Sequence, residues 1–215
     1  MKKLLLFLVL FATTTLAFAQ GKIIFGNDSL HLVCMTTDTD RLLPPDVSLA
    51  GQPVPPFGVL PSGPHLVVDL WAGTASGLLA KVATTTFSSA AGRFGPLSIT
   101  LPGGLPGGVP DFFQVQVYDQ LVGSYAAAAA SFLTYYGESP IFTCIPNSGV
   151  GYNSIVDNGP PSDSTWFPGP TPIPGGRVGF YVQMNPVPEP GALALAGLGA
   201  ALWAGLRRHG RLTAS

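Results

Sequence analysis

Short stretches of alternating apolar and polar residues in the middle of the chain predict β-strands. In 113–118 (FQVQVY), alternate residues beginning with Phe113 are apolar, which is typical of a strand with one buried face. The same pattern occurs in 65–71 (HLVVDLW) and in 178–184 (VGFYVQM). Weaker strand patterns occur at 23–25, 30–35, 79–86, 97–101 and 141–145.

Turn-forming residues separate these stretches, notably in the doubled LPGG segment 101–110. One helix is predicted over 124–136, with Ser124 as its N-cap and Gly137 as its C-cap. Residues 147–176 contain six Pro and six Gly, which predicts a long surface loop. Many short strands with a single short helix predict an all-β fold, an antiparallel two-sheet sandwich.

The composition agrees with this prediction and excludes one class of partner. Charged residues make up 10% of the chain, compared with about 25% in typical globular domains. Between residues 20 and 186 there are five basic and ten acidic side chains, a net charge of −5. Nucleic-acid binding requires clustered Lys and Arg side chains to neutralise phosphates. A nucleic-acid partner is therefore excluded.

The N-terminus contains the three parts of a secretory signal in the expected order. Two lysines precede the apolar run 4–12, and the small residues Ala17 and Ala19 precede Gln20. We expect a signal peptide at 1–19 that export machinery recognises and a signal peptidase removes. The alternative is a buried N-terminal helix.

An uncharged segment near the C-terminus predicts a membrane helix. Residues 191–206 are apolar or small, and Arg207, Arg208 and Arg211 follow on one side only. As a helix the segment would be about 24 Å long at about 1.5 Å per residue, shorter than a typical span. The positive-inside rule predicts that the arginine end stays cytoplasmic. A buried core helix and a permanent anchor are the alternatives to a transient stop.

The residues before this segment resemble a known sorting signal. Val187, Pro188, Glu189 and Pro190 precede the apolar segment and the arginine cluster, an arrangement similar to the PEP-CTERM signal of exported bacterial proteins. The resemblance implies an exosortase-type processing enzyme as a partner. It also implies an inner-membrane precursor that is then cleaved and delivered to the cell surface or released. The chain would then consist of a signal peptide, a β-rich passenger at 20–186 and a sorting tail at 187–215.

The chain contains two cysteines, Cys34 and Cys144, both in apolar strand-like stretches. In an exported protein an even pair predicts a disulfide, here closing a loop of about 110 residues. Two buried thiols are the alternative.

No motif in the passenger identifies a catalytic residue, a metal site or a cofactor. Asp38 and Asp40 could bind a divalent cation, whereas His31 and His65 are not spaced as zinc ligands. Ser76 lies in a sequence that misses the G-x-S-x-G motif by one residue. Asp69 could pair with Asp111 or Asp119 for glycoside hydrolysis. The aromatic residues Trp71, Trp166, Tyr135 and Tyr136 could line a sugar-binding surface, although core packing is the simpler role for Trp71. Structural roles are the more economical reading of each. The sequence therefore predicts an exported, non-enzymatic surface or extracellular-matrix protein. The alternatives are a permanently anchored surface module that binds polysaccharide or mediates adhesion, and an exported hydrolase.

Overall fold

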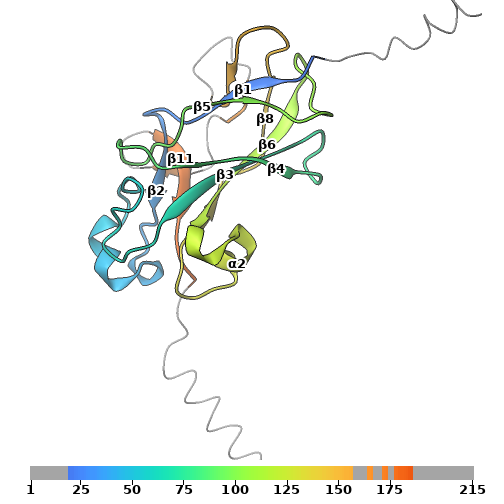
Figure 1. Ribbon diagram of the computed structural model, residues 1–215. Helices are drawn as coiled ribbons and strands as arrows, with labels where there is room; N and C mark the ends of the chain where they lie inside the picture. Colours follow the sequence, from blue (N-terminus) through green and yellow to red (C-terminus); the bar gives the residue numbers. More distant parts are fainter. Residues whose placement is uncertain (1–18, 157–163, 167–170, 174–176, 186–215) are drawn as a thin grey trace, which may run out of the picture.

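The computed structural model describes residues 19–156, 164–166, 171–173 and 177–185 (Figure 1). The described residues form mostly β-structure with a few short helices. The strands are β1 (Lys22–Phe25), β2 (His31–Met35), β3 (Leu66–Gly73), β4 (Ala80–Thr86), β5 (Leu97–Thr100), β6 (Asp111–Asp119), β7 (Tyr136–Glu138), β8 (Phe142–Cys144), β9 (Asn153–Ser154), β10 (Thr171–Ile173) and β11 (Arg177–Val182). The helices are η1 (Thr39–Arg41), η2 (Pro44–Leu49), η3 (Gln120–Val122) and α2 (Tyr125–Ala129).

The largest sheet has the strand order β4-β3-β6-β7, and β8 also pairs with β6. All of its pairs are antiparallel, and β3 pairs with β6 from Leu66 opposite Asp119 to Gly73 opposite Phe112. The predicted strands at 65–71 and 113–118 are thus confirmed, and they are direct neighbours in this sheet.

Two smaller sheets complete the fold, with orders β10-β11-β2 and β5-β1-β9. Strand β11 pairs with β2 in parallel, and β9 pairs with β1 in parallel. The β-rich class is confirmed, but the predicted antiparallel two-sheet sandwich is wrong in two respects. The strands form three sheets, and two of the strand pairs are parallel. Parallel neighbours require a long connection, and strand patterning alone does not reveal which distant segments pair.

The main core lies between the large sheet and the β2–β11 pair. Alternate residues of β3 and β6 point into it as predicted, and β2 and β11 contribute Val33, Met35, Phe180 and Val182. The inward residues of the large sheet are fully or almost fully buried: Leu66, Val68, Leu70, Phe113, Val115 and Val117. Full burial of one such side chain stabilises the fold by about 1.5–3 kcal/mol.

The segment after β8 is only partly the surface loop that its composition predicts. Trp166 is buried, and its ring stacks on Phe142 with centroids 4.9 Å apart. Ile155 and Val156 are also buried in the main core. The two-residue strand β9 and the buried Trp166 therefore make this Pro- and Gly-rich segment part of the hydrophobic core.

The predicted helix is shorter than its apolar pattern suggests. Ser124 caps α2 as expected, because its hydroxyl accepts from the Ala127 amide. The helix ends at Ala129, and Gly137 is a residue of β7 rather than a C-cap. Its role is close packing, since a Cβ at Gly137 would clash with the carbonyl oxygen of Tyr181 in β11.

The predicted disulfide between Cys34 and Cys144 is not formed in the structure. Neighbours of Cys34 in β2, Val33 and Met35, point into the main core, whereas Cys34 points to the opposite face and packs with Leu32 and Tyr181. Cys144 lies in the main core, and its thiol donates to the Ser154 carbonyl over 3.5 Å. Because side chains alternate between the two faces of a strand, the two sulfur atoms lie on opposite sides of β2.

Candidate functional site

The last described residues of the chain are held firmly against the domain. Strand β11 continues into Gln183, whose backbone exchanges hydrogen bonds of 2.8 and 2.9 Å with that of Tyr136. The Met184 amide donates to the Arg41 carbonyl at 3.0 Å, and the Met184 side chain is buried. The end of β11 is thus joined to β7 on one side and to η1 on the other.

Asn185 completes this attachment through its side chain. Its amide nitrogen donates to the carbonyl oxygens of Ala129 (2.6 Å) and Ser131 (3.0 Å) at the end of α2. Its amide oxygen accepts from the Tyr136 hydroxyl at 2.7 Å. We call the contacts of Gln183, Met184 and Asn185 with α2, β7 and η1 the C-terminal clamp. They fix the position and direction in which the chain leaves the domain.

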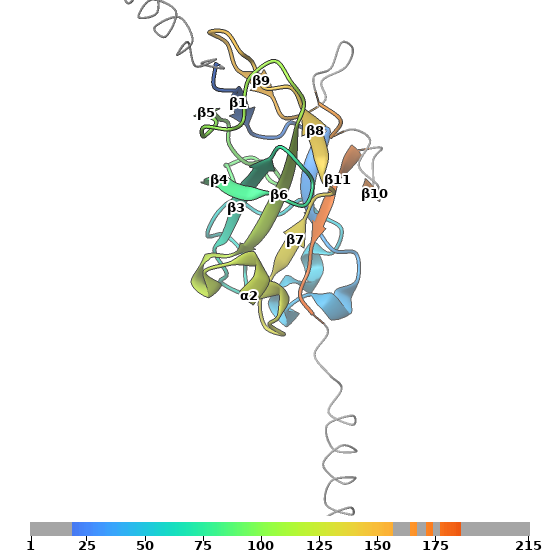
Figure 2. The same ribbon diagram turned by 90° about the vertical axis from the view of Figure 1, so that its right-hand side faces the viewer.

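The clamp lies at one end of the molecule. In Figures 1 and 2, β11 runs toward the end that contains α2, whereas β1 lies at the opposite end. The described chain therefore begins and finishes at opposite ends of the domain.

A family model for the PEP-CTERM protein-sorting motif matches residues 186–208, directly after Asn185. The chain therefore has a PEP-CTERM sorting motif, as its resemblance to the signal implied. This motif supports sorting through an exosortase-type system, with export, a C-terminal membrane anchor and later surface display. Searches of curated proteins and of solved structures found no match.

Most of the predicted targeting residues lie outside the described part of the chain: Ala17, Val187, Pro188, Glu189, Pro190, Arg207, Arg208 and Arg211. The predicted membrane segment 191–206 also lies outside it. Among the described residues, no helix has the length and apolar character needed to cross a membrane.

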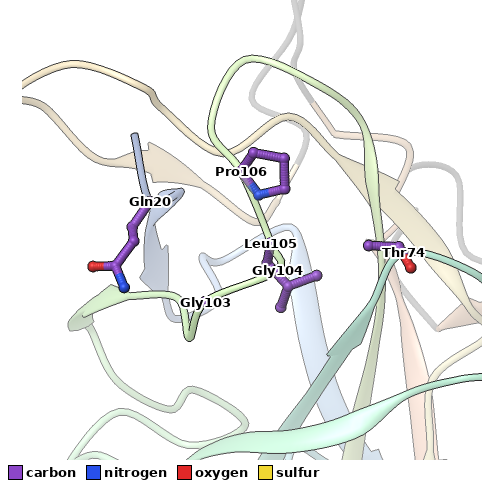
Figure 3. Close-up of a pocket in the computed structure, with 6 residues that line it drawn as sticks. All are labelled: Gln20, Thr74, Gly103, Gly104, Leu105 and Pro106. Atoms are coloured by element: carbon purple, nitrogen blue, oxygen red, sulfur yellow. The ribbon is translucent and has the colours of Figure 1, made fainter. Parts of the chain in front are cut away.

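The structure describes both residues that flank the predicted signal-peptidase cleavage site, Ala19 and Gln20. Both Ala19 and Gln20 are exposed, and the Ala19 carbonyl accepts from the Gly107 amide at 2.9 Å. Gln20, Thr74 and the LPGG loop residues Gly103 to Pro106 line a pocket of about 330 Å³ (Figure 3). The described residues that line the pocket are mostly apolar or glycine, and none of them is charged.

The three candidate carboxylates do not converge. Asp111 and Asp119 lie at the two ends of the nine-residue strand β6, about 26 Å apart at about 3.3 Å per residue. Asp69 is on the opposite face of the sheet, where it pairs with Lys81 at 3.4 Å and accepts from Thr84 at 2.6 Å. Glycoside hydrolysis requires two carboxyl groups about 5–9.5 Å apart on either side of the same bond. The predicted pairs join Asp69 to Asp111 or to Asp119. Neither pair is supported, because Asp69 lies opposite Gln116 and points to the other face of the sheet from both.

The remaining candidates have local structural roles. Asp38 caps η1 by accepting from the Asp40 amide. His31 is buried with its Nδ1 atom 2.7 Å from Asp28. His65 precedes β3 and Ser76 lies in the turn after it, so the length of the strand separates this pair.

The sequence did not predict that one aromatic and several polar side chains form a row on the outer face of the large sheet. Trp71 lies there, half-buried, opposite Gln114 of β6 and Lys81 of β4, rather than in the core. Gln114 donates to the exposed Glu138 at 3.2 Å, and Gln116 donates to Gln114 at 3.4 Å. The alternating pattern of β3 and β6 could have located this row, because its residues occupy the positions between the core residues. Trp166 and Tyr135 are buried elsewhere in the core, and the Tyr136 hydroxyl donates to Asn185. The sugar-binding surface predicted from the sequence is therefore reduced to the Trp71 region.

Asp111 is the least satisfied carboxyl group among those described. It is 2% exposed, and its Oδ2 atom is buried without a hydrogen-bond partner. Burial disfavours the charged form and raises the pKa of Asp111 from 3.8 to about 6. This group has no ligand-binding geometry, but it should make the stability of the domain depend on pH.

The clamp predicts a local effect of Asn185→Ala in the full chain. The variant loses three hydrogen bonds, each with a net contribution of about 0.5–1.5 kcal/mol. Amide hydrogen exchange of Gln183 and Met184 should therefore accelerate by about tenfold or more. Asn147→Ala is the matched control, because Asn147 makes side-chain hydrogen bonds near β1 and its loss should leave Gln183 unchanged. Equal exchange rates at Gln183 in Asn185→Ala and the unaltered protein would rule out the clamp.

The Asp111→Asn variant should remove one component of pH-dependent stability. Because the folded-state pKa of Asp111 is above its unfolded value, the folded state binds a proton more tightly. Its contribution to the free energy of unfolding is therefore greatest below pH 3.8, falls as the pH rises, and is lost above about pH 6. Denaturant titrations at several pH values should show Asp111→Asn gaining stability relative to the unaltered protein across this window. A difference that does not vary with pH would refute the assignment.

Proposed function

We propose that this protein is an exported, non-enzymatic component of the cell surface or extracellular matrix. Its β-rich passenger would be delivered through the C-terminal motif and separated from the membrane by an exosortase-type enzyme. The observation that supports this most strongly is the match to the sorting motif, which lies directly after the clamp. The clamp ends at Asn185, and the matched motif begins at residue 186.

In this proposal both ends of the precursor are removed. Signal peptidase cleaves after Ala19, a position that is exposed and lies at the edge of the described fold. The apolar segment 191–206 then holds the precursor in the inner membrane with its arginine end in the cytoplasm. Cleavage near Val187 to Pro190 releases or transfers a passenger whose last strand is already in place. Removing residues after Asn185 breaks none of the clamp contacts.

A second candidate is a surface module that retains its anchor and binds polysaccharide. The specific observation in its favour is the outer face of the large sheet, where Trp71 lies beside hydrogen-bonding Gln114, Gln116 and Glu138 side chains. An aromatic ring beside amides and a carboxylate offers both a stacking surface and partners for sugar hydroxyls. This candidate differs from the first in the fate of the tail.

Intact-mass analysis of the protein from each cell fraction tests the proposal. We expect a membrane precursor and a surface or released form that begins at Gln20 and lacks 191–206. Glu189→Ala should keep the exported protein in the membrane fraction with its tail, because the sorting motif is altered. Glu138→Ala is the matched control, since it removes the other glutamate of the chain and leaves the motif intact.

The second candidate predicts an exported protein whose mass still includes the C-terminal tail. If the exported protein from healthy cells still ends at Ser215, tail processing is wrong and the anchored module is favoured. If Glu138→Ala and Glu189→Ala lose the tail equally, the motif is not what directs cleavage.

A further inference from the structure

Large apolar side chains are exposed at the end of the domain where the chain leaves it. Leu133 is 71% exposed, Leu121 is 84% exposed and Phe132 is 49% exposed. We call these three residues the exit-end patch. Single exposed apolar residues are common, but several at one end of a domain can mark a contact surface.

Hydrogen bonds place the patch beside the C-terminal clamp. The Ser131 carbonyl accepts from the Asn185 side chain, and the Ser131 hydroxyl accepts from the Leu133 amide at 3.3 Å. Phe132 and Leu133 are therefore in the turn that holds Asn185. Leu121 belongs to η3, which contacts α2, and Figure 2 shows α2 at the same end as the end of β11.

The length of the sorting tail restricts what can meet this end of the domain. Five residues, 186–190, separate Asn185 from the uncharged segment 191–206. Even when fully extended, the linker reaches about 20 Å. A precursor whose segment 191–206 is inserted in a bilayer must therefore keep Asn185, and the patch beside it, within that distance of the segment.

The charge distribution also favours contact with lipid on this side. No charged residue occurs from Gln120 to Gly137. Asp119, which caps η3, is already buried, and the nearest exposed carboxylate is that of Glu138 in β7, beside Tyr125 of α2. Asp38 and Asp40 lie near η1, on the other side of the clamp. Desolvating these carboxylates is unfavourable, which directs the contact toward α2 and away from η1.

We propose that the exit-end patch rests on the lipid surface while the precursor is anchored. This inference depends on the membrane insertion of the tail in the proposed function. Leu121, Phe132 and Leu133 would enter the interfacial layer and hold the clamp at a fixed height above the bilayer. Residues 187–190 would then be presented to a membrane enzyme at a constant position.

The contact is weak once the tail is removed. Stable membrane attachment normally requires two signals acting together, and the patch would remain as the only one. The same three side chains can thus orient the precursor without retaining the cleaved passenger.

A fluorescent label at position 133 tests the contact in the full chain. The Leu133→Cys variant is labelled with an environment-sensitive thiol probe and reconstituted into vesicles of phosphatidylethanolamine and phosphatidylglycerol. Cys34 and Cys144 are buried, so the unaltered chain, treated in the same way, measures background labelling. We expect blue-shifted emission at position 133 and strong quenching by headgroup nitroxide lipids.

Val150→Cys is the matched control, because Val150 is 92% exposed and lies next to Gly149, which the Lys22 side chain of β1 contacts at the opposite end. Its label should remain unquenched. If the protein floats with the vesicles but position 133 is unquenched, or both positions are quenched equally, the patch inference is overturned while the anchor stands. If the full chain does not float with the vesicles, the anchor itself is refuted, and the inference with it.

Discussion

The parallel pairing of β11 with β2 is the interaction on which the rest of the structure depends. It brings the last strand of the passenger beside one of the first, with Val178 opposite His31 and Val182 opposite Met35. Phe180 and Val182 then close the core against the large sheet. The same strand meets β7 at Gly137, where the closeness of the Tyr181 carbonyl leaves no room for a Cβ. Removing β11 would therefore open the core and separate β2 from β7.

This constraint links the fold to the sorting motif. Because β11 is needed to close the core, the domain can fold completely only when the chain as far as β11 is available. The clamp holds Asn185, the residue directly before the motif matched at 186–208. The strand that closes the core is therefore the same strand that leads into the sorting motif.

The sequence was informative where a signal is local. Alternation located β3, β6 and β11 and assigned the inward faces of β3 and β6, since burial on one face imposes a two-residue period. The PEP motif was likewise readable from adjacent residues. Parallel pairing, the short strands β7 and β9 and the clamp were missed, because they depend on contacts between distant segments. In the sequence, nothing distinguishes Asn185 from any other polar residue before a proline. The predicted Cys34–Cys144 disulfide was wrong because the Cys34 side chain points away from the main core.

Comparing two truncated chains tests the central claim that β11 completes the fold. One chain contains residues 20–185 and the other residues 20–176, which lacks β11 and the clamp. Denaturant unfolding followed by near-ultraviolet circular dichroism should show the same cooperative transition for 20–185 as for the full-length passenger with its tail. The chain 20–176 should show no cooperative transition. A cooperative transition of equal midpoint in 20–176 would contradict the account.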